Sequence, residues 1–215
     1  MTVSDMIVAE SKEARQKNII LCQEAAKDPS KSHNKWLISK VNNYIERFAF
    51  EDECTAEDIL SKIQEDRLFA ASFAKDPGKQ QIHEKIQLRE LKKQLKEYSV
   101  EKQVSKGPNA VYIVDGKIFK GKPSNTTKQK SIDAIIDGYY CSLKFTHEGG
   151  GGQDNQKNDI ISFLENAGDI KVAAITDGNY YKNPEIKEQL DNYSSKNIFV
   201  GTRDDFIEKI STGAI

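Results

Sequence analysis

The hydrophobic pattern of this chain changes its character at one point, the short segment "SKGPN" at residues 105–109. The residues before it are low in glycine and rich in Glu, Lys, Gln and Ala, with apolar side chains at helical spacing. The residues after Pro108 form short apolar runs that are separated by turn sequences such as "DG". This change predicts a helical region followed by a core that contains a β-sheet.

The first part of the chain is predicted to be entirely helical. We expect helices near residues 3–27, 31–48, 55–65, 66–75 and 79–98. The segments "KDPSKSHN" and "KDPGK" end helices, because proline and glycine interrupt the pattern there. Thr55 is the expected N-cap of the third helix, with Asp58 three residues later as in a capping box.

The second part is predicted to alternate strands and helices. Strands are expected in "AVYIV", "KIF", "SIDAIID", "GYYCSLKFT", "KVAAITDG" and "NIFVG". Helices are expected near residues 154–167 and 184–193, and a last one in "RDDFIEKIST". The order predicts an α/β fold, with a mixed central β-sheet flanked by helices and an α-helical N-terminal region.

The charge of the chain is nearly balanced, with a formal net charge of −1. This argues against a nucleic-acid-binding protein that is basic over its whole surface, but it leaves room for one basic groove. Residues 116–132 contain five lysines and no acidic residue. This stretch either contacts phosphates or is a solvated lysine-rich loop.

The cysteines and histidines do not form a zinc pattern. Cys22, Cys54 and Cys141 lack metal-ligand spacing and do not form an even-numbered disulfide framework. We therefore expect a reducing, cytoplasmic environment. The chain has no signal-peptide pattern and no apolar run of about 20 residues, so no membrane partner is expected.

The segment "KSIDAIIDGYYCSLKF", residues 130–145, is predicted to be two strands joined by a tight turn. Asp133 and Lys144 lie on these neighbouring strands and can converge at one edge of the sheet. Alternation places Ser142 and Lys144 on one face, and Cys141 and Leu143 on the other. A lysine in a core strand is costly without a partner, so this pattern indicates either a functional site or the polar face of a surface strand.

The helix that precedes the sheet places a carboxylate on an apolar stripe. The stripe consists of Leu88, Leu91, Leu95 and Tyr98. Glu84 stands one turn earlier on it, and Ile82 and Ile86 form a second stripe at the same end. We therefore expect Glu84 to point inward, the alternative being a frayed helix end with a solvated carboxylate.

The segment "HEGGGGQDNQKNDIISFLENA" joins a glycine run to a helix. The glycines allow a close backbone approach or a hinge. The apolar face of the helix, at Ile160 and Leu164, extends backwards to Gln153, Gln156 and Lys157. These polar residues indicate a binding site, or else a first turn in which Asp154 lies near the N-cap.

Strand "SID", strand "SLK" and a helix opening with Gln together resemble the PD-(D/E)xK nuclease superfamily, in particular type II restriction endonucleases. The resemblance covers roughly residues 79–210. It implies a Mg²⁺-dependent, sequence-specific hydrolysis of phosphodiester bonds in double-stranded DNA by a homodimer. It also implies a nuclease core at residues 79–215 and a helical region for DNA contact or dimerisation at residues 1–78.

The resemblance assigns roles to individual residues. Asp133 matches the first metal-binding aspartate, although Ile132 and not proline precedes it, and Lys144 matches the lysine of the motif. Ser142 stands where the family has its second acid. Glu84 is the first choice to supply the missing metal-binding carboxylate, with Asp154 and Asp159 as alternatives. The residues expected to contact DNA are Gln153, Gln156, Lys157, Lys122, Lys128 and Lys130.

Two other functions remain open from the sequence. One is a repair or junction-resolving nuclease of the same fold, which site-specific cleavage of duplex DNA would separate from a restriction enzyme. The other is a non-catalytic DNA-binding or protein-interaction module, in which Ser142 marks a lost site. Metal-dependent cleavage would discriminate between this module and a nuclease.

Overall fold

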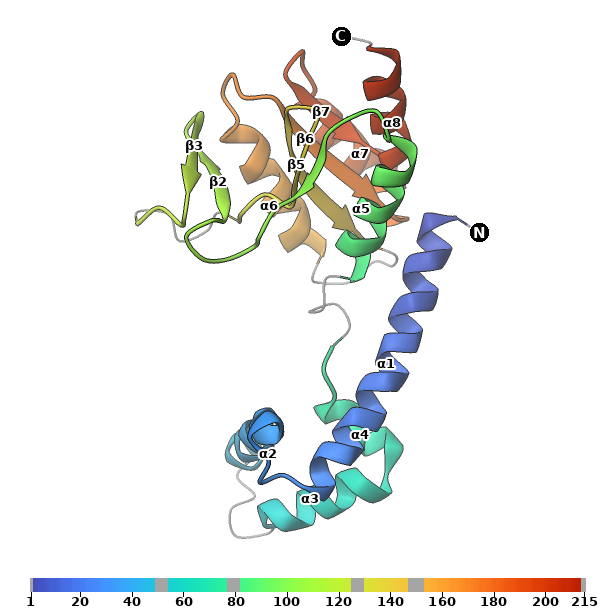
Figure 1. Cartoon of the computed structure of the whole chain (residues 1–215), viewed down its shortest axis with the longest axis vertical. Helices are drawn as coiled ribbons and strands as arrows, with labels where there is room; N and C mark the ends of the chain where they lie inside the picture. The colour runs from blue at the N-terminus through green and yellow to red at the C-terminus, as the bar shows by residue number, and fades with distance from the viewer. Residues whose placement is uncertain (1, 49–53, 77–81, 125–129, 147–152, 214–215) are drawn as a thin grey trace. The chain divides into compact units, whose positions relative to one another are not determined.

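The computed structural model describes residues 2–48, 54–76, 82–124, 130–146 and 153–213 (Figure 1). The chain divides into two compact units. We call Asp5–Ile82 the helical unit, and His83–Ile215 together with Met1–Ser4 the sheet unit. The division falls four residues after the boundary expected from the sequence, which was between residues 78 and 79.

The helical unit contains the helices that the sequence predicts. They are α1 (Val3–Lys27), α2 (Lys35–Phe48), α3 (Ala56–Glu65) and α4 (Arg67–Phe73), with a short 3₁₀ helix at Ser32–Asn34 before α2. Thr55 and Asp58 form the expected capping box at the start of α3. The side chain of Asp66 caps α4 by accepting hydrogen bonds from the backbone N–H groups of Leu68 and Phe69.

The polar groups in the interior of the helical unit are bonded to its own backbone. The core is apolar and includes Cys22, Leu37 and Ile63. The Asn18 side chain donates to the backbone oxygen of Lys75 at 2.7 Å. Lys40 Nζ donates to the backbone oxygens of residues 73 and 74, at 2.7 and 2.9 Å. These side chains therefore satisfy backbone oxygens at the end of α4 and just after it.

The sheet unit starts with α5 and alternates strands and helices after it. Its elements are α5 (Ile82–Gln94), β1 (Val100–Lys102), β2 (Val111–Val114), β3 (Lys117–Lys120), β4 (Ala134–Ile136), β5 (Tyr139–Phe145), α6 (Gln153–Glu165), β6 (Val172–Asp177), a 3₁₀ helix (Tyr180–Lys182), α7 (Pro184–Asp191), β7 (Ile198–Gly201) and α8 (Arg203–Thr212).

The main sheet has five strands in the order β1-β4-β5-β6-β7. Strand β4 is antiparallel to both β1 and β5, whereas β5, β6 and β7 are parallel to one another. The β4–β5 turn places Asp137 and Gly138 at φ values of 47° and 80°, as a tight hairpin turn requires. The sheet is therefore mixed, and the predicted α/β class is confirmed.

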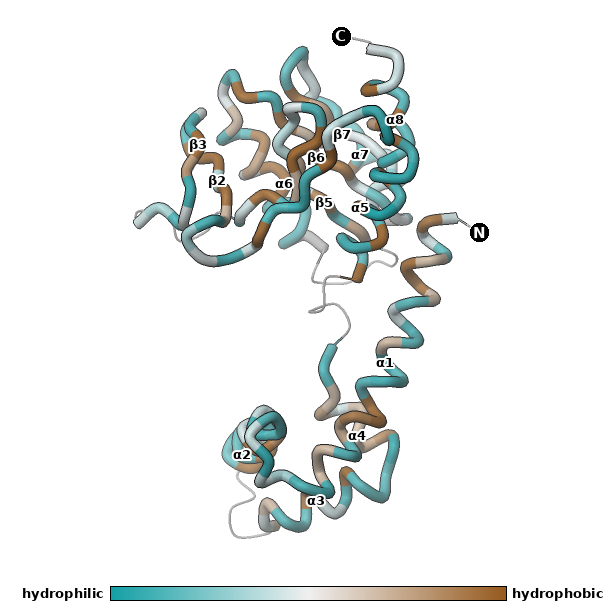
Figure 2. Tube along the Cα trace, in the orientation of Figure 1, coloured by the Kyte–Doolittle hydropathy of each residue, from teal (hydrophilic) through white to brown (hydrophobic). Residues whose placement is uncertain are grey.

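Helices cover both faces of this sheet. On one face, α5 and α8 pack against Cys141 and Leu143 of β5. On the other face, α6, α7 and strand β2 pack against β6 and β7. Figure 2 shows hydrophobic residues concentrated in the central strands β5 and β6. The expected alternation along β5 is confirmed, because Cys141 and Leu143 point away from the face that carries Ser142 and Lys144.

Two details of the predicted sheet were wrong. Strand β1 lies before "SKGPN", in a segment that was expected to close the helical region. It pairs with β4 although two of its three residues are charged, so its strand character comes from its neighbour. The runs "AVYIV" and "KIF" form a separate two-stranded sheet, β2–β3, in which all four residues of β2 are buried.

Two further findings concern the whole described part of the chain. Cys22, Cys54 and Cys141 are free thiols. Among the helices that the structure describes, none combines the length and the apolar character needed to cross a membrane.

Candidate functional site

The site begins where β4 separates from β5. Asp133, the residue before β4, still donates its backbone N–H to the carbonyl oxygen of Cys141 at 2.9 Å. Its carboxylate Oδ2 accepts a hydrogen bond from the backbone N–H of Leu143 at 2.7 Å. One residue earlier, Ile132 already bonds to Val111 of β2 instead. The Asp133 carboxylate thus takes the place of a ladder carbonyl beside the last residues of β5.

Lys144 is the penultimate residue of β5 and is half-buried. Within the part of the chain that the structure describes, its ammonium group makes no hydrogen bond or ion pair. Its charge acts on the carboxyl groups of Asp133 and Glu84. A half-buried lysine that is near two carboxylates but bonded to neither is available to a ligand.

Glu84 lies in the first turn of α5 and points inward, as expected, with only 14% of its side chain exposed. The pKa of its carboxyl group is raised to about 7, chiefly by burial and also by the negative charge of Asp133, against the opposing effect of Lys144. Burial also raises the pKa of Asp133, against the opposing effect of Lys144. The two carboxyl groups and the lysine therefore share one electrostatic environment.

His83 stands next to Glu84 but is not its charge partner. Burial, together with the charge of Lys144, lowers the pKa of His83 to about 4. Its Nε2 lies 3.9 Å from a carboxylate oxygen of Glu84. The imidazole is therefore neutral near pH 7, and this contact is not an ion pair there.

Gln87 connects this helix to the two central strands. Its side chain is fully buried one turn after Glu84. Its Nε2 donates to the backbone oxygen of Lys144 at 3.3 Å and to Oδ2 of Asp177 at 2.9 Å. Among the described residues, its Oε1 has no hydrogen-bond partner. Gln87 thus fixes the position of α5 relative to the ends of β5 and β6, and leaves one buried acceptor unused.

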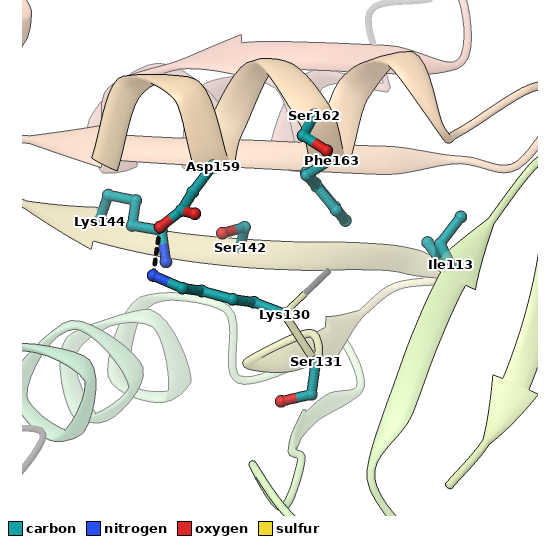
Figure 3. Close-up of a pocket in the computed structure, with 8 residues that line it drawn as sticks. All are labelled: Ile113, Lys130, Ser131, Ser142, Lys144, Asp159, Ser162 and Phe163. Carbon is teal, nitrogen blue, oxygen red and sulfur yellow. Dashed lines mark hydrogen bonds and ion pairs between the residues drawn. The ribbon is translucent and has the colours of Figure 1, made fainter. Parts of the chain in front are cut away.

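A pocket lies on the α6 side of β5 (Figure 3). Its lining residues are Ile113, Lys130, Ser131, Ser142, Lys144, Asp159, Ser162 and Phe163. Lys130 and Asp159 form an ion pair at its mouth, and Lys144 reaches toward the same space. Ser142 is buried beneath them. The lysine of the candidate motif is therefore accessible from a polar pocket.

Of the four residues that the sequence places in the catalytic role, Glu84, Asp133 and Lys144 lie close enough for their charges to act on one another. Ser142 lines the pocket that Lys144 also lines. Asp159, an alternative carboxylate, lies in the pocket but is paired with Lys130. The side chain of Asp154, the other alternative and a predicted metal ligand, lies outside the described residues.

The residues expected to contact DNA are in varied surroundings. Gln156 accepts a hydrogen bond from Thr146 Oγ1 at 3.0 Å, and Lys157 donates to Gln189 Oε1 of α7 at 3.2 Å. Lys122 is exposed. The side chain of Gln153 and the whole of Lys128 lie outside the described residues.

Sequence reasoning missed Gln87 and Asp177. Gln87 lies between the two apolar stripes of α5, directly after Ile86 and before Leu88, and its burial could have been expected from that position. Asp177 ends β6, next to the strand that carries Lys144. Polar residues at the carboxyl ends of adjacent parallel strands often line a binding site.

Comparisons of the chain with protein-family models, with curated proteins and with solved structures find no match. What the protein does must therefore be inferred from the geometry of the site itself.

The donor set of the site can be tested against a metal ion. No three His, Cys, Asp or Glu side chains come together as a metal cage in the described ranges. The site instead offers two carboxyl groups, Asp133 and Glu84, whose charges act on each other. One or two carboxylates completed by water and phosphate oxygens are the usual protein ligands of Mg²⁺, so these residues fit that ion.

Proposed function

We propose that this protein is a Mg²⁺-dependent endonuclease that hydrolyses phosphodiester bonds in double-stranded DNA at a specific sequence, as type II restriction enzymes with a PD-(D/E)xK core do. The observation that carries the proposal is the convergence of Glu84, Asp133 and Lys144 where β4 separates from β5. The mixed sheet with helices on both faces is compatible with such a core.

In the proposed reaction, Asp133 and Glu84 would hold the metal ion. That ion would supply an activated water and neutralise negative charge on the phosphate. Lys144 orients the attacking water and stabilises the charge that develops on the phosphate oxygens. Gln87 keeps the backbone of Lys144 in place through its hydrogen bond to the carbonyl oxygen.

The helical unit has a proposed role in DNA contact or in forming a homodimer. A two-fold dimer matches a palindromic target, because each protomer then meets the same half-site. In the cleavage experiment below, symmetric ends on the fragments indicate such a palindromic target.

The first test is cleavage of a long, mixed-sequence duplex DNA in the presence of Mg²⁺. The wild type is compared with Lys144→Met, which keeps the aliphatic stem and removes the charge. Lys92→Met serves as the control, because Lys92 is exposed at the other end of α5. We expect discrete fragments from the wild type and the control and none from Lys144→Met. Equal cleavage by Lys144→Met would overturn the assignment.

The second test measures the metal site without DNA. Mg²⁺ should raise the melting temperature of the wild type, since it binds only the folded protein. Asp133→Asn should lose most of this increase. An equal increase in both proteins would place the metal elsewhere.

One observation favours a second function, a non-catalytic DNA-binding module. Ser142 stands where the resembling nucleases have an acid, and it offers no carboxylate to the site. If the folded wild type binds duplex DNA but leaves it intact with Mg²⁺ and with Mn²⁺, this second function replaces the first.

A further inference from the structure

The β2–β3 ribbon is firmly attached to the sheet unit. The carbonyl oxygen of Val111 in β2 accepts a hydrogen bond from Ile132 N at 2.9 Å. At the other end, the turn between the strands is bound by Asn166, which follows α6. The backbone N–H groups of Asp115 and Gly116 donate to Asn166 Oδ1 at 3.1 Å and to its carbonyl oxygen at 2.9 Å. The ribbon is therefore a fixed part of the unit.

The two strands of this ribbon differ completely in exposure. All four residues of β2 are buried, whereas all four residues of β3 are exposed. Ile118 and Phe119 are 46% and 36% exposed. Because side chains alternate along a strand, these two point to opposite faces of the ribbon, so each face carries one exposed apolar side chain.

The exposed strand lies next to the candidate site. Ile118 pairs with Ile113, so both side chains are on the same face of the ribbon. Ile113 in turn lines the pocket that contains Ser142 and Lys144 (Figure 3). The face of β3 that carries Ile118 thus continues the wall of the pocket outward.

The lysines of this strand are not neutralised. In the ranges that the structure describes, Lys117, Lys120 and Lys122 form no ion pair or side-chain hydrogen bond, unlike Lys130, which is paired with Asp159. Three unpaired positive charges around two apolar side chains are complementary to a polyanion that also has apolar surface. Duplex DNA has this character, with phosphates along its edges and base edges and methyl groups in the grooves.

We propose that β3 is the element that this protein places against duplex DNA, with Lys117, Lys120 and Lys122 on phosphates and Ile118, on the face that adjoins the pocket, directed into a groove. This rests on the proposed nuclease function, because it takes the same duplex as the substrate of the site. A two-stranded ribbon fits the width of the major groove, so the geometry needs no opening of the duplex. Ile118 then contributes to sequence preference and the lysines to affinity.

The test is the binding of a 30-base-pair duplex, about three helical turns, at several salt concentrations and without a metal ion. A triple variant, Lys117→Ala with Lys120→Ala and Lys122→Ala, is compared with a control triple variant at Lys92, Lys96 and Lys196. The control lysines are exposed and unpaired among the described residues, and they lie at the end of the sheet remote from Lys144. Both variants change the net charge equally, so a difference between them is due to position.

We expect the ribbon variant to bind about 10- to 100-fold more weakly, and the slope of log K against log salt to fall by about 2 to 3. The control variant should change neither the affinity for the duplex nor the salt slope by more than a small factor. Ile118→Thr keeps β-propensity and should reduce the preference for the cleaved sequence over other duplexes, whereas Phe119→Thr, on the opposite face of the ribbon, should leave it unchanged. Unchanged affinity and slope in the ribbon variant would overturn the proposal.

The same experiment would also detect a different binding partner of β3. Tighter binding of duplex RNA than of DNA, or the loss of a dimer in the ribbon variants with DNA affinity retained, would overturn the proposal. Because binding is measured without cleavage, it separates the two proposals. If the wild type binds through the ribbon but never cleaves, only the nuclease function fails; if it cleaves and the ribbon variants bind normally, only the role of β3 fails.

Discussion

Lys40 in the helical unit and Lys144 in the sheet unit are both half-buried, but they are used in opposite ways. Lys40 donates to two backbone oxygens at the end of α4, and its charge lies 5.5 Å from the ring centre of Trp36. Lys144 has no partner of this kind in the described ranges, although two carboxyl groups with raised pKa values lie near it. The comparison separates a lysine that completes a fold from one that is held ready for a ligand.

The largest expected effect tests the difference between Lys144 and Lys40 directly. Lys144→Met should lower the cleavage rate by about 10²- to 10³-fold, the usual cost of losing one group that stabilises charge in the transition state. Its free energy of unfolding should stay the same or rise, because a half-buried charge without a partner is removed. Lys40→Met should leave the cleavage rate unchanged and lower the free energy of unfolding by about 1–3 kcal/mol. Single-turnover cleavage and urea unfolding of both variants measure this, and the reverse pattern would refute the distinction.

The next effect concerns pH. Between its usual pKa of 4.5 and the folded value of about 7, Glu84 holds a proton in the folded protein that the unfolded chain releases. The free energy of unfolding without metal should therefore fall as the pH rises through this window. Metal binding requires the carboxylate, so the cleavage rate should rise about tenfold per pH unit up to about pH 7.

Glu84→Gln is the control for this pH dependence. The variant should flatten the stability profile between pH 4.5 and 7 and should remove the dependence of Mg²⁺ affinity on pH. Urea unfolding and Mg²⁺ titration at pH 5.5, 6.5 and 7.5 provide the measurement. A wild-type profile that is already flat would show that Glu84 does not face the site.

A smaller effect distinguishes two buried amides. Gln87→Leu and Asn18→Leu each remove hydrogen bonds to buried oxygens and should lower the free energy of unfolding by about 1–3 kcal/mol. Only Gln87→Leu should also lower the cleavage rate, by several-fold, because it releases the backbone of Lys144. The change should appear in kcat and not in KM, and Gln87→Glu should not restore it, because a carboxylate cannot donate to the carbonyl oxygen of Lys144.

The smallest effect should be the same in both units. Thr55 and Thr202 each form a capping box, with Asp58 and Asp205 as the reciprocal acids. Thr55→Ala and Thr202→Ala should each lower the free energy of unfolding by about 1 kcal/mol without changing the cleavage rate. Chemical unfolding of both variants checks this, and a loss of cleavage with Thr202→Ala would show that α8 contributes to the site.

The parts of the structure that were predictable from the sequence are those with local causes. The capping box at Thr55 determines the start of α3, and the "DG" turns determine the two hairpins, so both are visible in a few consecutive residues. The inward position of Glu84 was predictable because a helix repeats its faces every three to four residues.

The parts that were missed depend on partners far away in the chain. Strand β1 has no alternating pattern and is a strand only because β4 pairs with it. The β2–β3 ribbon is a sheet of its own, and β2 is joined to the chain just before β4 by the bond from Ile132 to Val111, 21 residues away. The role of Gln87 in the site could not be recognised from the sequence, because its partner Asp177 lies 90 residues later in the chain.

The position of Glu84 two residues after the start of α5 affects the temperature at which the protein should lose its activity. The ends of helices open at a lower free-energy cost than the central strands of a sheet, and Asp133 and Lys144 are held by β4 and β5. The first turn of α5 should therefore exchange its amide hydrogens sooner than β5 does. We expect cleavage to stop several degrees below the melting temperature, so that this protein becomes inactive while its sheet is still intact.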